Sequence, residues 1–129
     1  MTTNSLNPTQ RVIPTIRILQ YVRSKAFYVD GLGFRICWEH RFKPGLPVFM
    51  EVSRDGMTLF LTEHTGDCPT GALVHLYVAD VDEWYNEAVR NGISVEMPDE
   101  SLQGLRAMTI VDPDGNKLRI CTRLPNWKR

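Results

Sequence analysis

The sequence predicts an α+β fold of two similar modules, each a strand, a helix and three more strands, that together form a concave mixed sheet. A hairpin pattern occupies residues 106–121, where two alternating runs flank Asp114-Gly115. A similar pattern, with Asp55-Gly56 at its turn, lies 59 residues upstream. Asp-Gly between strand-like runs favours a hairpin because glycine accepts the positive φ of the turn. The repeated pattern indicates an internal duplication.

The first half of the chain begins with a strand. Residues 12–19 alternate in the manner of a strand, and Pro14 places part of it at a sheet edge because proline donates no hydrogen bond. A short helix follows at residues 22–30 and ends at Gly31 and Gly33. Three further strands are predicted at residues 34–40, 47–53 and 57–62.

The second half repeats this order after a turn-rich linker. Its helix begins at Asp80, a good N-cap with Glu83 three residues on, and ends before Gly92. Strands are predicted before it at residues 73–78 and after it at residues 93–96, and the hairpin of residues 106–121 ends the fold. We expect one domain over residues 1–129, with a first module at 11–63, a linker at 64–71 and a second module at 72–123.

Composition narrows the range of partners. Fifteen Lys and Arg residues balance fifteen Asp and Glu residues, so no net charge attracts nucleic acid or an anionic membrane. No apolar run approaches the roughly 20 residues of a membrane span. Three cysteines without metal-type spacing suit a reducing compartment, and residues 1–11 lack the apolar core of a signal peptide. We therefore expect a cytoplasmic protein.

Alternation along the strands assigns each side chain to one face of its sheet. The apolar set predicted to face the helices is Ile16, Ile18, Met50, Val52, Leu59, Leu61, Val74, Leu76, Val78, Leu118 and Ile120. The opposite face mixes polar and aromatic side chains, as a binding surface does. Its candidate ligand-binding residues are Arg17, Trp38, Phe49, Glu51, Phe60, His75, Tyr77, Arg106, Met108 and Arg119.

Two of these candidates depend on the register of the last hairpin. Two-residue pairing about Asp114-Gly115 sets Arg119 opposite Ile110 and brings Arg106 and Met108 to the candidate face. A bulge in that turn would shift the register and remove both. In this register Met108 would form a wall of the pocket.

Each remaining candidate has a binding interpretation and a structural one. The four aromatic side chains could stack on a planar ligand or belong to the core. Arg17 and Arg119 could bind an anionic group, pair with Glu51 or reach solvent. His75 could donate a hydrogen bond to a ligand or, less readily, bind a metal. Glu51 could also act as a general base. Two further histidines, His40 and His64, are expected on the solvated surface.

Several segments resemble the vicinal oxygen chelate superfamily, which includes glyoxalase I, extradiol dioxygenases, and fosfomycin- and bleomycin-resistance proteins. The segments lie in the expected order at residues 26–34, 57–61, 78–85, 104–106 and 112–116. The resemblance spans about residues 12–123 and implies two β-α-β-β-β modules. It also implies a homodimer with a pocket between modules.

Enzymes of that superfamily hold a divalent metal with His or Gln on each module's first strand and Glu on its last strand. The corresponding positions in this sequence are Ile13, Phe60, Leu73 and Arg119. Aliphatic and aromatic groups offer no lone pair, and a guanidinium repels a cation. The resemblance is therefore to the bleomycin-resistance branch, which binds ligands without a metal or other cofactor and without catalytic residues.

The sequence thus favours a metal-independent protein that sequesters a small molecule, with antibiotics as one candidate class. One alternative is a metal-dependent glyoxalase-like lyase or dioxygenase using displaced ligands such as His75 and Glu51. Another is a metal-free subunit that acts only through protein contacts. Bleomycin itself is cationic, and a face with Arg17, Arg106, Lys117 and Arg119 against Glu51 would disfavour it unless a partner subunit supplied acidic groups.

Overall fold

The computed structural model describes residues 10–125 and has an α+β architecture, as predicted. The first module consists of β1 (Thr15–Arg17), α1 (Tyr21–Lys25), η1 (Ala26–Gly31), β2 (Arg35–His40), β3 (Phe49–Arg54) and β4 (Met57–Thr62). The second consists of β5 (Leu73–Tyr77), α2 (Val81–Arg90), β6 (Leu105–Val111) and β7 (Lys117–Arg123). The η1 segment is a π-helix that continues α1. None of these helices is long and apolar enough to cross a membrane.

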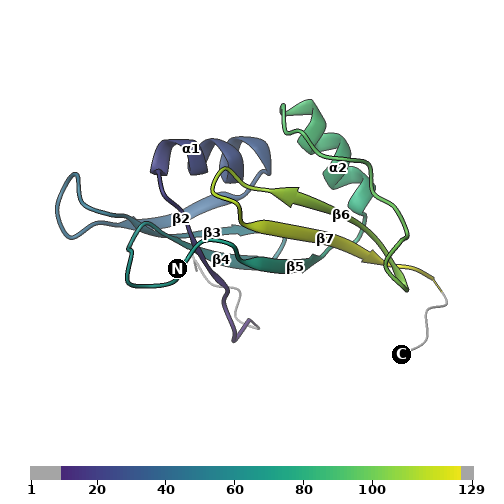
Figure 1. Cartoon of the computed structure of the whole chain (residues 1–129), viewed down its shortest axis with the longest axis horizontal. Helices are drawn as coiled ribbons and strands as arrows, with labels where there is room; N and C mark the ends of the chain where they lie inside the picture. The colour runs from purple at the N-terminus through teal and green to yellow at the C-terminus, as the bar shows by residue number, and fades with distance from the viewer. Residues whose placement is uncertain (1–9, 126–129) are drawn as a thin grey trace.

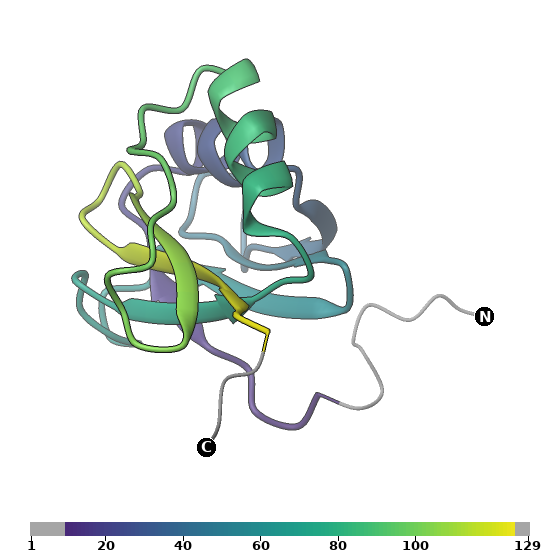
Figure 2. The same cartoon turned by 90° about the vertical axis from the view of Figure 1, so that its right-hand side faces the viewer.

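The strands form two mixed sheets, with the helices over one side of them (Figures 1 and 2). The first sheet has the order β1-β4-β3-β2 and the second the order β5-β7-β6. β1 runs parallel to β4 and β5 parallel to β7, while the other pairs are antiparallel. Each helix links the first strand of its module to later strands, so it crosses one face of the sheet and leaves the other uncovered.

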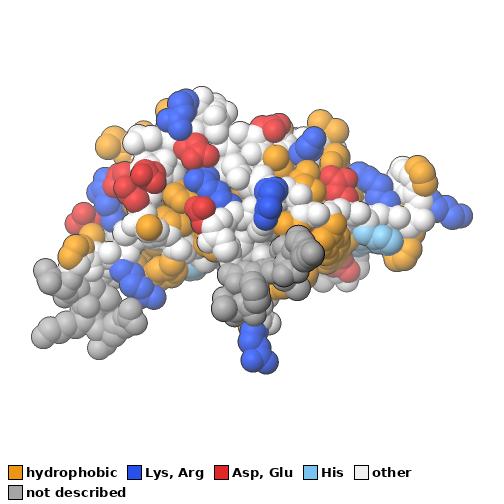
Figure 3. Space-filling view, turned by 180° about the vertical axis from the view of Figure 1, so that it is seen from behind, with side chains coloured by type: hydrophobic (Ala, Val, Ile, Leu, Met, Phe, Trp, Pro, Cys, Tyr) orange, Lys and Arg blue, Asp and Glu red, His pale blue; other side chains and the backbone are white. Residues whose placement is uncertain are grey.

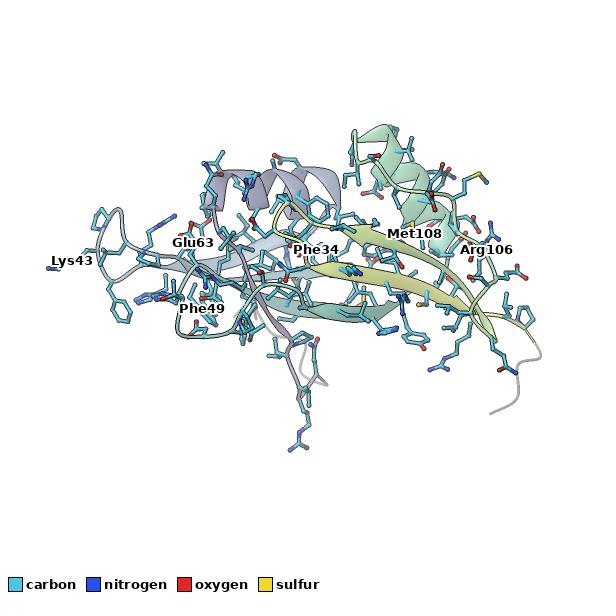
Figure 4. The ribbon with its side chains drawn as sticks, viewed as in Figure 1. Phe34, Lys43, Phe49, Glu63, Arg106 and Met108 are labelled. Atoms are coloured by element: carbon cyan, nitrogen blue, oxygen red, sulfur yellow. The ribbon has the colours of Figure 1, made fainter. Side chains whose placement is uncertain are left out.

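The core lies between the helices and the sheets. All eleven apolar residues predicted to face the helices are buried or pack against the buried cluster. Phe34, directly before β2, lies among aromatic rings, with its ring centroid 6.3 Å from that of Tyr28 and 6.1 Å from that of Trp84. Edge-to-face pairs of this kind stabilise beyond the area that they bury. Phe34 therefore joins the helical layers of both modules (Figure 4).

The strand predicted at residues 93–96 is not formed in the described chain. Only an isolated bridge between Asp99 and Ala107 joins this region to β6, which becomes the edge of a three-stranded sheet. Ile93 explains the departure, because its N–H donates to the carbonyl of Ala88 and its side chain packs against Gly31. The chain thus leaves α2 toward the first module, and a cavity of about 510 Å³ separates residues 94–97 from β6.

The predicted register of the β6–β7 hairpin is wrong by one residue. Arg119 lies opposite Thr109 rather than Ile110. The turn spans residues 112–116 instead of two residues, because Asp112 accepts hydrogen bonds from the backbone N–H groups of residues 114 and 116. A one-residue shift moves every side chain of β6 to the other face of the sheet.

This turn also joins the two modules. The Tyr28 hydroxyl donates to Asp112 over 2.7 Å, and the Asn116 amide donates to the Arg17 carbonyl over 2.8 Å. The Asn116 carbonyl oxygen accepts from the backbone N–H groups of residues 71–72, each over 3.0 Å. Asn116 is completely buried. One side chain therefore connects β1, the segment before β5 and the hairpin turn.

Candidate functional site: the helix-free face of the sheets

The helix-free face is the side of the two sheets opposite α1 and α2. On the first sheet, Glu51 of β3 is paired with Trp38 of β2 and with Phe60 of β4, so all three side chains share this face. On the second sheet, His75 of β5 is paired with Arg119 of β7 in the same way. Eight predicted residues lie on this face, namely Arg17, Trp38, Phe49, Glu51, Phe60, His75, Tyr77 and Arg119. The alternation of the strands therefore predicted this face correctly, and whether these residues bind a ligand stays a prediction.

Two candidates lie on the other face. The register shift turns Arg106 and Met108 toward α2, as Figure 4 shows. Met108 is 3% exposed and belongs to the core. Arg106 forms a bidentate ion pair with Asp82 of α2, with N···O distances of 2.9 and 3.0 Å. The expectation that both face the candidate site is therefore wrong.

A bulge in β2 places Trp38 on the helix-free face. Ile36 pairs with Val52, whereas Trp38 pairs with Glu51. Between these two pairs β2 therefore contains one more residue than β3. Without this bulge, Trp38 would pair with Met50 and point toward the helices. Bulges commonly redirect a side chain near a binding site.

Three rings on neighbouring strands form the aromatic cluster, which consists of Trp38, Phe49 and Phe60. The ring centroids of Trp38 lie 6.0 Å from both phenylalanines, and those of Phe49 and Phe60 lie 5.1 Å apart. Trp38 stacks on Phe49 with an interplanar angle of 17°, and 37% of Trp38 is exposed. The cluster offers an aromatic surface on which a planar molecule could stack.

A pocket of about 380 Å³ opens beside this cluster, near the loop between β2 and β3. We call it the aromatic pocket; it is lined by Trp38, His40, Phe42, Phe49, His64 and Asp67. Figure 3 shows histidine side chains beside hydrophobic ones at this end of the molecule. The expectation that both histidines lie on the solvated surface is confirmed for His40, which is exposed, whereas His64 is half-buried. His40, two residues after Trp38, could have been assigned by the alternation of β2, but His64 lies in a loop without such a signal.

Glu51 lies beneath the aromatic cluster. It is only 1% exposed, and its Oε2 atom has no hydrogen-bond partner. Burial raises the pKa of the neighbouring Cys37 thiol, and its hydrogen bond to Glu51 acts in the same direction. A buried polar group without a partner costs roughly 1–3 kcal/mol of stability. A carboxylate in this position thus needs an explanation other than stability.

The second sheet gives the helix-free face a basic region. His75 lies beside Arg119, whose Nε donates to Thr109, and the guanidinium of Arg123 lies 4.5 Å from the Tyr77 ring centroid. Tyr77 is 45% exposed. In the described chain neither Arg17 nor Arg119 forms an ion pair with Glu51; Arg17 donates instead to the Ile18 carbonyl.

A further cavity of about 310 Å³ lies between the modules on this face. It brings His75 and Tyr77 of β5 close to Thr58 of β4, whose hydroxyl is buried without a partner. The aromatic cluster does not line this cavity. Within one chain the predicted residues therefore form two groups, one on each sheet.

A family model described as glyoxalase superfamily protein matches residues 3–126. The chain belongs to the glyoxalase superfamily. No curated protein sequence matches it significantly. The match covers both modules, including the segments on which the sequence-based resemblance rested.

Several solved structures share the fold at low identity. A bleomycin-binding protein in complex with bleomycin is 24% identical over 90% of this chain and all of its own, with a TM-score of 0.73. An antibiotic-binding protein from Streptomyces sp. CB03234 is 22% identical over 90% of this chain and 98% of its own, with a TM-score of 0.69. A glyoxalase/bleomycin resistance protein/dioxygenase superfamily member from Sphaerobacter thermophilus is 22% identical over 88% and 98%, with a TM-score of 0.68.

The residues of this superfamily member do not fit the divalent metal that the resemblance implies. Phe60 lies in the aromatic cluster, and Arg119 beside His75 offers a cation where an acidic ligand would be needed. The displaced ligands considered from sequence, His75 and Glu51, lie on different sheets. No three His, Cys, Asp or Glu residues within residues 10–125 are grouped as metal ligands.

Proposed function

We propose that this protein binds a small planar organic molecule on the aromatic cluster and sequesters it without a metal and without chemical change. The carrying observation is the aromatic cluster itself, with the indole of Trp38 partly exposed beside a pocket of about 380 Å³. Aromatic rings on a rigid sheet lose little conformational freedom when they stack on a ligand. Antibiotics are one class to test, because two similar structures are of a bleomycin-binding and an antibiotic-binding protein.

Titration calorimetry with a panel of planar antibiotics that includes bleomycin tests the proposal. Trp38→Ala is expected to weaken binding about fivefold or more, because a stacked ring contributes about 1 kcal/mol beyond the area that it buries. Trp38→Phe keeps a ring and is the matched control, with a smaller loss. Unchanged affinity in Trp38→Ala, in a variant with normal thermal stability, would refute this site.

The proposal includes a homodimer in which a second copy covers the helix-free face. Large apolar side chains are exposed there, with Phe42 73%, Leu73 47% and Tyr77 45% exposed. Such side chains on one face are typical of an interface. The molar mass in solution is therefore expected to be about twice the 14.8 kDa of the chain. A monomer at micromolar concentration, with ligand present, would contradict this part.

Metal independence and location complete the proposal. Protein treated with a strong chelator is expected to bind its ligand with unchanged affinity, because the four expected ligand positions carry no suitable donor. Loss of binding that returns with added Mn²⁺, Fe²⁺, Ni²⁺ or Zn²⁺ would favour the metal-dependent alternative. We place the protein in the cytoplasm because an odd number of cysteines without metal-type spacing suits a reducing compartment better than a disulfide framework.

A further inference from the structure

We infer that the ligand of the aromatic cluster carries a protonated amine or a similar cationic N–H donor, and that Glu51 selects for it. This inference rests on the proposed binding function and names the class of ligand. Its basis is the combination of Glu51 with three aromatic rings on one face of β2, β3 and β4.

The carboxylate of Glu51 has an acceptor atom to offer. Oε2 is buried without a hydrogen-bond partner, although Glu51 lies in the middle of a regular sheet. In the described chain no Lys or Arg side chain forms an ion pair with Glu51. Arg35 of β2 donates instead to Ser53, two residues along β3 from Glu51. A cationic donor on the ligand would supply the partner that the protein does not.

The rings favour the same kind of group. Phe60 and Trp38 are the cross-strand neighbours of Glu51, and Phe49 completes the cluster above it. The face of an aromatic ring carries negative electrostatic potential and attracts a cation, while the ring surface accommodates a planar body. A carboxylate ligand would instead be repelled by Glu51. The site therefore combines stacking with recognition of positive charge.

Trp38 is the ring that can admit such a ligand. It is 37% exposed, it lies on β2 at the edge of the sheet, and it follows a bulge in that strand. Phe60 lies on β4, between β1 and β3, and is less exposed than Trp38. Outward rotation of the indole would open a path to Oε2 of Glu51.

Three probes with the same ring system test the inference: naphthylmethylamine, naphthylmethanol and naphthoate. Wild-type protein is expected to bind the amine about tenfold more tightly than the alcohol, and the acid most weakly, since the amine alone forms a charge-assisted bond. Glu51→Gln is expected to remove the tenfold preference, measured as the ratio of the affinities for the amine and the alcohol in the same variant. Glu83→Gln, which removes an exposed carboxylate of α2, is the matched control and is expected to keep the preference.

Equal affinity of wild-type protein for the amine and the alcohol would overturn the inference. This outcome uses the wild-type protein alone, so it does not depend on the stability of any variant. A preference that survives in Glu51→Gln would overturn the role of Glu51. If the alcohol binds and Trp38→Ala loses it, the proposed binding function stands even where the amine preference fails. If none of the probes binds and no member of the antibiotic panel binds, the proposed function fails together with the inference.

Discussion

Replacing Asn116 with Ala would test the joint between the modules. The side chain accepts from the amides of residues 71–72 and donates to the Arg17 carbonyl and the Asp112 carboxylate, with distances of 2.8 to 3.0 Å. Each such bond contributes about 1 kcal/mol net. Asn116 is buried, so water replaces these bonds poorly. We therefore expect Asn116→Ala to lower the free energy of unfolding by about 3–4 kcal/mol.

Urea unfolding followed by tryptophan fluorescence measures this loss, since Trp84 is buried and reports on the core. A loss of this size is a large part of the roughly 5–15 kcal/mol that stabilises a typical domain. Asn86→Ala, on the exposed side of α2, is the control and is expected to change stability by less than about 0.5 kcal/mol. A loss below about 1 kcal/mol for Asn116→Ala would refute the idea that this residue holds the modules together.

Two further substitutions test other contacts. Tyr28→Phe removes the hydroxyl that donates to Asp112 and should cost about 1–3 kcal/mol in thermal or urea unfolding. Burial, and then Asp112, raises the pKa of Tyr28, so wild-type stability should fall as pH rises above 10, where the unfolded tyrosine ionises, and the Phe variant should fall less steeply. Arg106→Leu should change the urea midpoint little, because solvent screens the partly exposed Asp82 pair, and should leave ligand affinity unchanged in calorimetry. Arg106 lowers the pKa of Asp82, so its small contribution should be present above pH 4 and lost as acid protonates Asp82.

Most of the fold could be predicted from alternation and turn chemistry. These signals are local, and they located every strand and helix of the described residues, but they also predicted a strand at residues 93–96 that does not form. That segment alternates as a strand does, but Ile93 is held by α2 and Gly31 rather than by β6. A contact with the other module decided the outcome, and no local pattern in the sequence reports it.

The candidate site was predictable where the strands pair without a bulge or an irregular turn. Phe49, Glu51 and Phe60 lie on regularly paired strands, and their shared face followed directly from the period of two. Arg106 and Met108 were misplaced because the side chain of Asp112 organises a longer turn than Asp-Gly alone suggests. The β2 bulge was equally hidden, because an extra residue in a strand changes spatial pairing without changing composition.

The open edge of β6 has a consequence for solubility. The backbone N–H and C=O of Ala107 point away from β7 and form hydrogen bonds with the backbone of Asp99. Because backbone direction alternates along a strand, the N–H and C=O groups of Thr109 and Val111 point away from β7 as well. Unguarded edges of this kind recruit strands from other molecules and lead to fibrous aggregates. Here the neighbouring segment carries three carboxylates, Glu96, Asp99 and Glu100. Their mutual repulsion between molecules would keep concentrated protein dispersed, and acid conditions that neutralise them would favour precipitation.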